Sequence, residues 1–176
     1  MRDSRWRAWL TETARDLIMD AAAAAHPKET GGVLLGVLTH GRPWITTAVE
    51  VPHAGATGVY YELAGGAAPA IVDAMTLRDP RLGYLGEWHS HPADVGPSDL
   101  DARSMRAIAA DATAGCKRPV LIIARRHLAT YELDGRQLQR RRLRSLRLID
   151  AGALPAMTGA KTPPTPPTTK LASEGR

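Results

Sequence analysis

The sequence predicts a single α/β domain in which helices flank a mixed β-sheet, and three observations lead to that prediction. The chain has 176 residues, of which 44% are hydrophobic and 23% charged, so it can bury a sizeable core. Segments with helical spacing alternate along it with short β-branched runs. A proline- and threonine-rich stretch follows, so we assign residues 1–149 to the domain and expect residues 150–176 to form a disordered tail.

Segments with apolar residues at three-to-four-residue spacing predict amphipathic helices. Pro27 ends the first of them and Asp79-Pro80 ends the second. The third begins at Ser98, a typical N-cap, and ends at Gly115, a typical C-terminal stop. The predicted helices cover residues 6–25, 67–77 and 98–114.

Short apolar or β-branched runs between these helices predict strands. The predicted strands cover residues 31–38, 44–51, 59–63, 82–88, 119–124 and 128–133. We expect a turn at residues 41–43, an interruption at the polar residues 125–127, and a hairpin turn at Asp134-Gly135. Residues 137–148 would then supply a returning strand or a final helix.

Cysteine usage and hydropathy limit the compartment. Cys116 is the single cysteine, which excludes an intramolecular disulfide and suits the reducing cytoplasm. We expect no signal peptide, because no continuous apolar segment precedes a cleavage-like site near the N-terminus. The apolar run at residues 18–25 is far shorter than the ~20 residues of a membrane span. These features predict a cytoplasmic protein with no membrane partner.

The net charge of +5 comes largely from arginines concentrated in residues 136–147. Such a cluster could face nucleic acid or an acidic protein, although it is more often a solvated face. No aromatic residue is interleaved with these arginines after Tyr131, which argues against base stacking. We therefore do not expect nucleic acid as a partner.

Residues 86–92, Gly-Glu-Trp-His-Ser-His-Pro, contain the side chains that best indicate a metal site. His89 and His91 are two positions apart at the end of a predicted strand, so their rings project to the same side and can reach one metal. Asp101, in the first turn of the next helix, would add a carboxylate. Two histidines and a carboxylate leave an open fourth position for water, as in catalytic zinc sites. Zn²⁺ is therefore the predicted cofactor.

A catalytic zinc site also needs a carboxylate that takes a proton from the attacking water. Glu29, directly before a glycine-led strand, and Glu87, on the histidine strand, are both candidates from spacing alone. Trp88 should face the opposite side of that strand and pack in the core.

The chain resembles the JAB/MPN (JAMM) metalloproteases. Their signature is an early Glu-x-Gly-Gly segment followed by His-Ser/Thr-His-Pro and Ser-x-x-Asp. Here Glu29-Thr30-Gly31-Gly32 is similar to the first element, and His89-Ser90-His91-Pro92 with Ser98-Asp99-Leu100-Asp101 to the second. The resemblance covers roughly residues 9–148 and implies a three-layer, cytidine-deaminase-like architecture.

The resemblance also implies a role for each matching residue. His89, His91 and Asp101 would bind zinc, Glu29 would act as the general acid/base, and Ser98 would help to stabilise the oxyanion. Glu87 would then have a structural or supporting role. One departure concerns Ser98, because this chain has six residues between His91 and the serine where the family usually has seven.

Other histidines and the cysteine have plainer interpretations. Cys116 lacks features of a nucleophile and is expected to fill a helix end. The remaining histidines lack partners at ligand spacing and are expected at the surface or in turns. They are His26, His40, His53 and His127.

The family resemblance implies hydrolysis of an amide or isopeptide bond after the C-terminal tail of a ubiquitin-like protein. The form of the motif and the small size are most similar to prokaryotic members linked to ubiquitin-like conjugation, including deconjugating proteases of bacterial anti-phage operons. The alternatives are a processing peptidase for a sulfur-carrier protein, a small-molecule amide hydrolase, and a non-catalytic MPN scaffold. Retention of all five motif residues argues against the scaffold.

Overall fold

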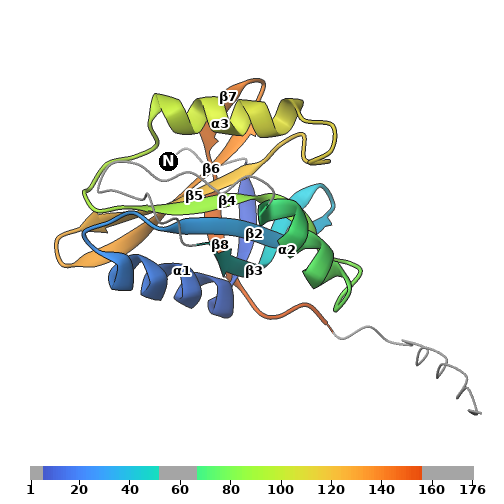
Figure 1. Ribbon diagram of the computed structural model, residues 1–176, viewed down its shortest axis with the longest axis horizontal. Coiled ribbons are helices and arrows are strands. Elements are labelled where there is room, and N and C mark those ends of the chain that lie inside the picture. The colour runs from blue at the N-terminus through green and yellow to red at the C-terminus, as the bar shows by residue number, and fades with distance from the viewer. Residues whose placement is uncertain (1–5, 52–66, 156–176) are drawn as a thin grey trace, which may run out of the picture.

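The computed structural model describes residues 6–51 and 67–155, in which a mixed β-sheet lies between helices, as predicted (Figure 1). The strands follow the order β7-β6-β5-β4-β2-β3-β1-β8, with parallel pairs β4/β5, β3/β1 and β1/β8. The elements are β1 Arg7–Thr11, α1 Glu12–Ala25, β2 Gly31–Thr39, β3 Arg42–Glu50, α2 Ala67–Thr76, β4 Gly83–His91, α3 Asp99–Ala110, β5 Val120–His127, β6 Thr130–Gln139, β7 Arg142–Ser145 and β8 Arg147–Ala151.

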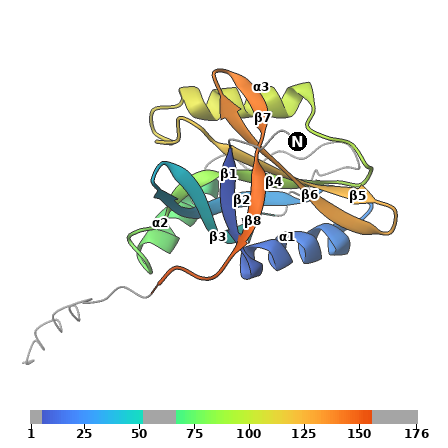
Figure 2. The same cartoon turned by 180° about the vertical axis from the view of Figure 1, so that it is seen from behind.

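The sheet is strongly curled, because its two edge strands are consecutive in the chain. β7 and β8 lie at opposite ends of the strand order, yet Leu146 alone separates them. The Leu146 amide donates a 2.9 Å hydrogen bond to the Gly135 carbonyl of β6, and its side chain is buried. Figure 2 shows β8 beside β1 and the chain entering β8 from β7. The curl lets the sheet wrap around α1.

The two faces of the sheet carry different cores. On the α1 face, the main cluster joins the helix to six strands through fully buried side chains such as Ile18, Trp88 and Ile122. On the other face, α3 packs through Met105 on a smaller cluster that includes Leu121 and Ile123. Figure 1 shows α1 and α3 on opposite sides of the sheet. This three-layer arrangement fixes the directions in which β4 presents its side chains.

The first predicted helix is wrong over its N-terminal part. Arg7–Thr11 forms β1, and α1 begins at Glu12, with the Thr11 side chain accepting a 3.3 Å hydrogen bond from the Ala14 amide. β1 pairs in parallel with β3 and with β8, whose residues are far away in the chain. Those strand pairings outweigh the helical spacing of Trp6 and Trp9, and they cannot be predicted from the local sequence pattern.

The predicted hairpin turn at Asp134-Gly135 is also wrong. Both residues lie inside β6, which pairs with β5 from Val120↔Gln137 to His127↔Thr130. The polar residues 125–127 therefore continue β5 rather than interrupting it. The chain reverses after β6 at Arg140 and Arg141, which both have positive φ, of 46° and 65°. Cross-strand pairing on both sides of Gly135 outweighs its turn preference.

The remaining elements follow the predictions with shifted ends. The helix at residues 67–77 and the strand at 82–88 are confirmed as α2 and β4. The helix predicted at residues 98–114 ends earlier, because α3 stops at Ala110. The turn predicted at residues 41–43 lies at His40-Gly41. Residues 137–148 form strand rather than helix. The predicted strand at residues 59–63 lies outside the described residues, as does the tail beyond residue 155; Asp150 and Ala151 belong to β8. Among the described helices, none has the length and hydropathy of a membrane span.

Candidate metal centre

His89 and His91 stand at the C-terminal end of β4 on the same face of the sheet, as their spacing predicts. Their Nε2 atoms are 3.1 Å apart, and His89 Nε2 is 3.2 Å from Asp101 Oδ1. One ligand atom from each of these three residues lies within 4.8 Å of the other two. Both histidines are largely buried. The structure therefore brings together the two histidines and the carboxylate that the sequence predicts as metal ligands.

The ring of His91 is oriented by the loop that follows it. His91 Nδ1 lies 3.0 Å from the Val95 carbonyl oxygen, which can only accept a hydrogen bond. Nδ1 therefore carries the proton, and in the neutral ring Nε2 keeps its lone pair facing His89 and Asp101. Burial lowers the pKa of His91, which also favours the neutral ring. A backbone acceptor on the distal ring nitrogen is the usual arrangement for metal-ligating histidines.

Asp101 is held by a capping box at the start of α3. Ser98 is the N-cap, and its side chain accepts from the Asp101 amide while the Asp101 carboxylate accepts from the Ser98 amide. The Ser98 hydroxyl also donates to Asp101 Oδ2 at 2.8 Å, so Oδ1 faces His89. The six-residue connection from His91 thus still places Ser98 beside the carboxylate of Asp101.

Glu29 reaches the site through the pairing of β2 with β4. Gly31 is opposite His89, and the Ser90 amide donates to the Thr30 carbonyl at 2.7 Å. The Thr30 amide in turn donates to Ser90 Oγ at 3.0 Å. A Cβ on Gly32 would collide with the Val49 carbonyl of β3, which explains a glycine here. These contacts position Glu29, which is only 6% exposed, close enough to His89 for their charges to interact.

The carboxyl groups of Glu29 and Asp101 have opposite electrostatic environments. Burial raises the pKa of Glu29 to about 7, and the charge of His89 opposes part of this shift. Burial acts on Asp101 in the same direction, but hydrogen bonding and charge from His89 and hydrogen bonds from Ser98 lower its pKa to about 2. Asp101 is therefore the permanent anion, whereas Glu29 can exchange a proton near neutral pH.

The donor set is suited to zinc. Two imidazole nitrogens and one carboxylate oxygen, from a strand end and a helix start, are the ligand types of three-residue catalytic zinc sites. The Val95 carbonyl on His91 and the Ser98 groups on Asp101 supply the outer hydrogen bonds that such ligands need.

Glu87 shares the face of β4 with the histidines but is not part of this donor set. Its Oε1 accepts a 3.2 Å hydrogen bond from the Tyr84 hydroxyl. Burial raises the pKa of Glu87, although that hydrogen bond and the charge of His89 act against it. Trp88, between Glu87 and His89, is fully buried on the α1 face, as predicted.

Sequence reasoning missed a network that anchors the loop between His91 and Ser98. Asp94 in this loop pairs with Arg125 Nη1 at 3.0 Å and with His127 Nδ1 at 2.7 Å, both on β5. Residues 125–127 were expected to interrupt the sheet. Their alternation in a continuing strand would have been the signal, because it places Arg125 and His127 on the same side.

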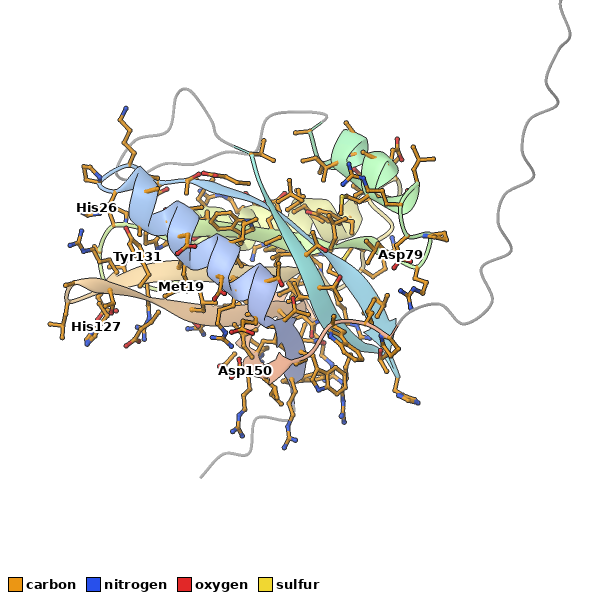
Figure 3. All side chains as sticks on the ribbon, turned by 90° about the horizontal axis from the view of Figure 1, so that it is seen from below. Met19, His26, Asp79, His127, Tyr131 and Asp150 are labelled. Carbon is orange, nitrogen blue, oxygen red and sulfur yellow. The ribbon has the colours of Figure 1, made fainter. Side chains whose placement is uncertain are left out.

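The other singled-out residues do not join the metal centre. Figure 3 shows His26 at the end of α1 close to Tyr131, whose hydroxyl lies 3.2 Å from His26 Nδ1. His40 is in a turn, and His53 lies outside the described residues. The Cys116 thiol lies 3.7 Å from the Leu85 carbonyl, and burial raises its pKa, which disfavours a nucleophilic thiolate.

Comparison with known proteins identifies the family. The model of the prokaryotic homologs of the JAB domain matches residues 11–143, so the chain belongs to this family. A 43-residue segment is 51% identical to the CD-NTase/cGAS isopeptidase of Enterobacter hormaechei subsp. hoffmannii (strain UCI 50) and spans 24% of each protein. The solution structure of DSY2949 from Desulfitobacterium hafniense is similar in fold, with a TM-score of 0.62 and 17% identity over 84% of this chain and 94% of that one.

Proposed function

We propose that this protein is a zinc-dependent isopeptidase that hydrolyses the amide or isopeptide bond after the C-terminal tail of a ubiquitin-like protein, in a bacterial conjugation or anti-phage system. The observation that carries the proposal is the convergence of His89, His91 and Asp101 within 4.8 Å of one another beside the buried Glu29. Family membership and the isopeptidase name of the Enterobacter relative support it.

His89, His91 and Asp101 would hold the metal through Nε2, Nε2 and Oδ1. When bound, zinc supplies a Lewis acid that polarises the scissile carbonyl and acidifies a water molecule. The Val95 carbonyl keeps His91 in the tautomer that presents Nε2. The hydrogen bonds from Ser98 keep the Asp101 carboxylate ionised and oriented. These contacts set the geometry before any ligand arrives, which lowers the cost of reorganisation.

Glu29 would move the proton. With a pKa raised to about 7, its carboxylate can accept a proton from the attacking water near neutral pH. The resulting carboxylic acid can then protonate the departing amine. The burial of Glu29 excludes bulk water from this transfer. One residue can therefore serve as base and then as acid in the same turnover.

Ser98 would stabilise negative charge on the scissile carbonyl oxygen. Its hydroxyl hydrogen points to Asp101 Oδ2, and its oxygen accepts from the Asp101 amide at 3.2 Å. Donation to the substrate requires only rotation of the hydroxyl hydrogen away from Oδ2. The bond from the amide keeps the oxygen in place during that rotation, so the donor stays positioned.

The decisive test separates the proton carrier from the metal ligands. Glu29→Gln should keep the zinc content of the wild type and lower kcat by roughly 10²–10⁴-fold, because only the proton acceptor is lost. The assay uses a ubiquitin-like protein carrying a C-terminal fluorogenic amide, with Glu12→Gln, an exposed carboxylate on α1, as the control. Undiminished turnover in Glu29→Gln would show that another base serves. Absence of zinc and of hydrolysis in the wild type would instead favour a non-catalytic scaffold.

A further inference from the structure

A separate cavity of about 320 Å³ lies on the same face of the sheet as the metal centre, between α2, β4 and α3. Its wall is mostly apolar, with Val72 of α2 and Ile108 of α3 among the lining side chains. This volume is at the lower end of the range for ligand pockets, ~300–1,000 Å³. The cavity is therefore suited to a side chain rather than to a large cofactor.

A β-bulge in β4 creates the polar part of this cavity. β2 pairs Leu34 with Gly86 and Leu35 with Tyr84, which leaves Leu85 as an extra residue on β4. Gly86 has a φ of +147°, and a Cβ there would collide with the Val120 carbonyl. Without the bulge, Tyr84 and Glu87 would face opposite sides of the strand. With it they face the same side and form the 3.2 Å hydrogen bond.

Three carboxylates from three different elements line the cavity, and among its described lining residues there is no lysine or arginine. Asp73 comes from α2, Glu87 from β4, and Asp111 from the C-terminal cap of α3. The Asp111 carboxylate accepts bonds from the Thr113 amide and hydroxyl, which orient it. The C-terminal end of α3 adds negative partial charge. An apolar wall with acidic groups complements an alkyl stem that ends in a cation.

The cavity adjoins the metal centre along β4. Glu87 precedes His89 by two residues on the same face, which corresponds to roughly 7 Å at ~3.3 Å per residue. A substrate in extended conformation covers the same distance in about two residues. A side chain that enters the cavity would thus belong to a residue about two positions from the bond held at the metal centre.

We propose that this cavity is a specificity pocket for a lysine or arginine side chain of the substrate, about two residues from the scissile bond. The assignment to a substrate rests on the proposed function. The alkyl stem would lie against Val72 and Ile108, and the cationic head would meet Glu87. The Tyr84 hydroxyl fixes the carboxylate orientation that receives it.

Binding of short probes tests the pocket without requiring turnover. N-acetyl-arginine methylamide and N-acetyl-lysine methylamide are titrated into the full chain, with uncharged N-acetyl-norleucine methylamide as the matched probe. The methyl NMR signals of Val72 and Ile108 should shift, and at least one cationic probe should bind roughly 10-fold more tightly than norleucine. Equal binding of all three probes, or no shift at these methyls, would overturn the proposal.

Variants identify the groups responsible. Glu87→Gln, which keeps an acceptor for Tyr84, should remove most of the preference for the cationic probe. Asp73→Asn changes an exposed side chain and should weaken the preference in a protein that folds normally. Asp16→Asn, on the opposite layer, should leave it unchanged. An unchanged preference in both Glu87→Gln and Asp73→Asn would refute the role of these carboxylates.

A hydrolysis series separates this inference from the proposed function. Internally quenched fluorescent peptides with arginine, norleucine or glutamate two residues before or after the scissile bond are compared by kcat/KM. Arginine at one of these positions should be preferred, and Glu87→Gln should reduce that preference. No preference at either position would overturn the substrate assignment. If neither these peptides nor the ubiquitin-like protein amide is cleaved while the probes bind selectively, the proposed function fails and the cation selectivity of the pocket stands.

Discussion

Trp88 and His89 are neighbours in the chain, yet they lie on opposite faces of β4 and in opposite environments. Trp88 is fully buried in the α1-side core among Ile122, Leu10 and other apolar side chains. His89 faces the α3 side, where Glu29, Glu87 and Asp101 place carboxyl groups close to it. The α1 face supplies stability, and this lets the other face hold partly desolvated polar groups that contribute little to folding.

The contrast between the apolar α1 face and the polar α3 face explains why the candidate metal centre lies on the α3 face. Polar groups on the α3 face are satisfied by specific partners, such as Val95 for His91 and Ser98 for Asp101. The smaller apolar cluster around Met105 anchors α3 without closing over the strand end. If the division is correct, substitutions on the two faces should separate loss of chemistry from loss of stability.

The largest effect is expected on the polar face. His89→Ala should abolish zinc binding and reduce hydrolysis to background, because two protein ligands hold zinc far more weakly than three. The free energy of unfolding of the metal-free protein should change much less. Metal analysis of purified protein measures the first effect and urea denaturation the second. His40→Asn, in a turn, is the control, and full zinc content in His89→Ala would refute the metal assignment.

On the apolar face, Trp88→Ala should lower the free energy of unfolding by about 3–5 kcal/mol, because it removes a large, fully buried side chain. At temperatures where the variant is folded, zinc should still bind. Urea denaturation of metal-free wild type and variant provides the measurement, and Leu128→Ala, at an exposed position, is the control. A stability loss in His89→Ala as large as in Trp88→Ala would refute the claim that stability comes mainly from the α1 face.

Ser98 should show a smaller and mixed effect. Ser98→Ala removes an N-cap, which costs about 1 kcal/mol of stability. If the hydroxyl also stabilises the oxyanion, kcat should fall by roughly 10²–10³-fold. Ser98→Thr retains both the cap and the hydroxyl and should restore most of each loss. Normal kcat in Ser98→Ala with reduced stability would limit Ser98 to its capping role.

The smallest effect concerns the anchor of the loop after His91. The hydrogen bond and charge of Asp94 raise the pKa of His127, and the hydrogen bond from His127 lowers the pKa of Asp94. Their mutual stabilisation is lost as pH rises through the raised pKa of His127 and as it falls through the lowered pKa of Asp94. It is fully present between the ordinary values of ~3.9 and ~6.5.

Asp94→Asn should therefore lower the melting temperature slightly more at pH 5.5 than at pH 8.5, where Arg125 remains as a partner. Thermal unfolding at the two pH values, with ~0.1 M salt to limit long-range effects, measures the difference. In a His127→Gln background this pH dependence should disappear. Equal effects at the two pH values would show that Arg125 rather than His127 makes the stronger contact with Asp94.

Much of the site was predictable from sequence because its geometry depends on local periodicity. Two histidines two apart on a strand share a face wherever the strand lies. A serine three residues before an aspartate at a helix start forms a capping box for local reasons, and Ser98 and Asp101 do so. The sequence did not reveal that residues 7–11 form strand β1 or that Asp134-Gly135 lies inside β6, because both outcomes depend on pairing with other strands.

The edge strand β7 illustrates the same limit for the arginine cluster. The sequence reveals a run of arginines but not its location. In the structure, β7 is a four-residue strand at the sheet edge, with Arg142 and Arg144 exposed. Charged side chains on a short edge strand oppose pairing with another chain. A solvated face therefore accounts for these exposed arginines.

The sequence by itself determined most of the helices and strands, the choice of His89, His91 and Asp101 as candidate metal ligands, and the opposite orientations of Trp88 and His89. Only the tertiary structure decided the partner of each strand, the burial that raises the pKa of Glu29 to about 7, and the bulge that joins Tyr84 to Glu87. The reason is physical: side-chain direction follows local backbone periodicity, whereas desolvation, register and bulges depend on contacts between distant segments.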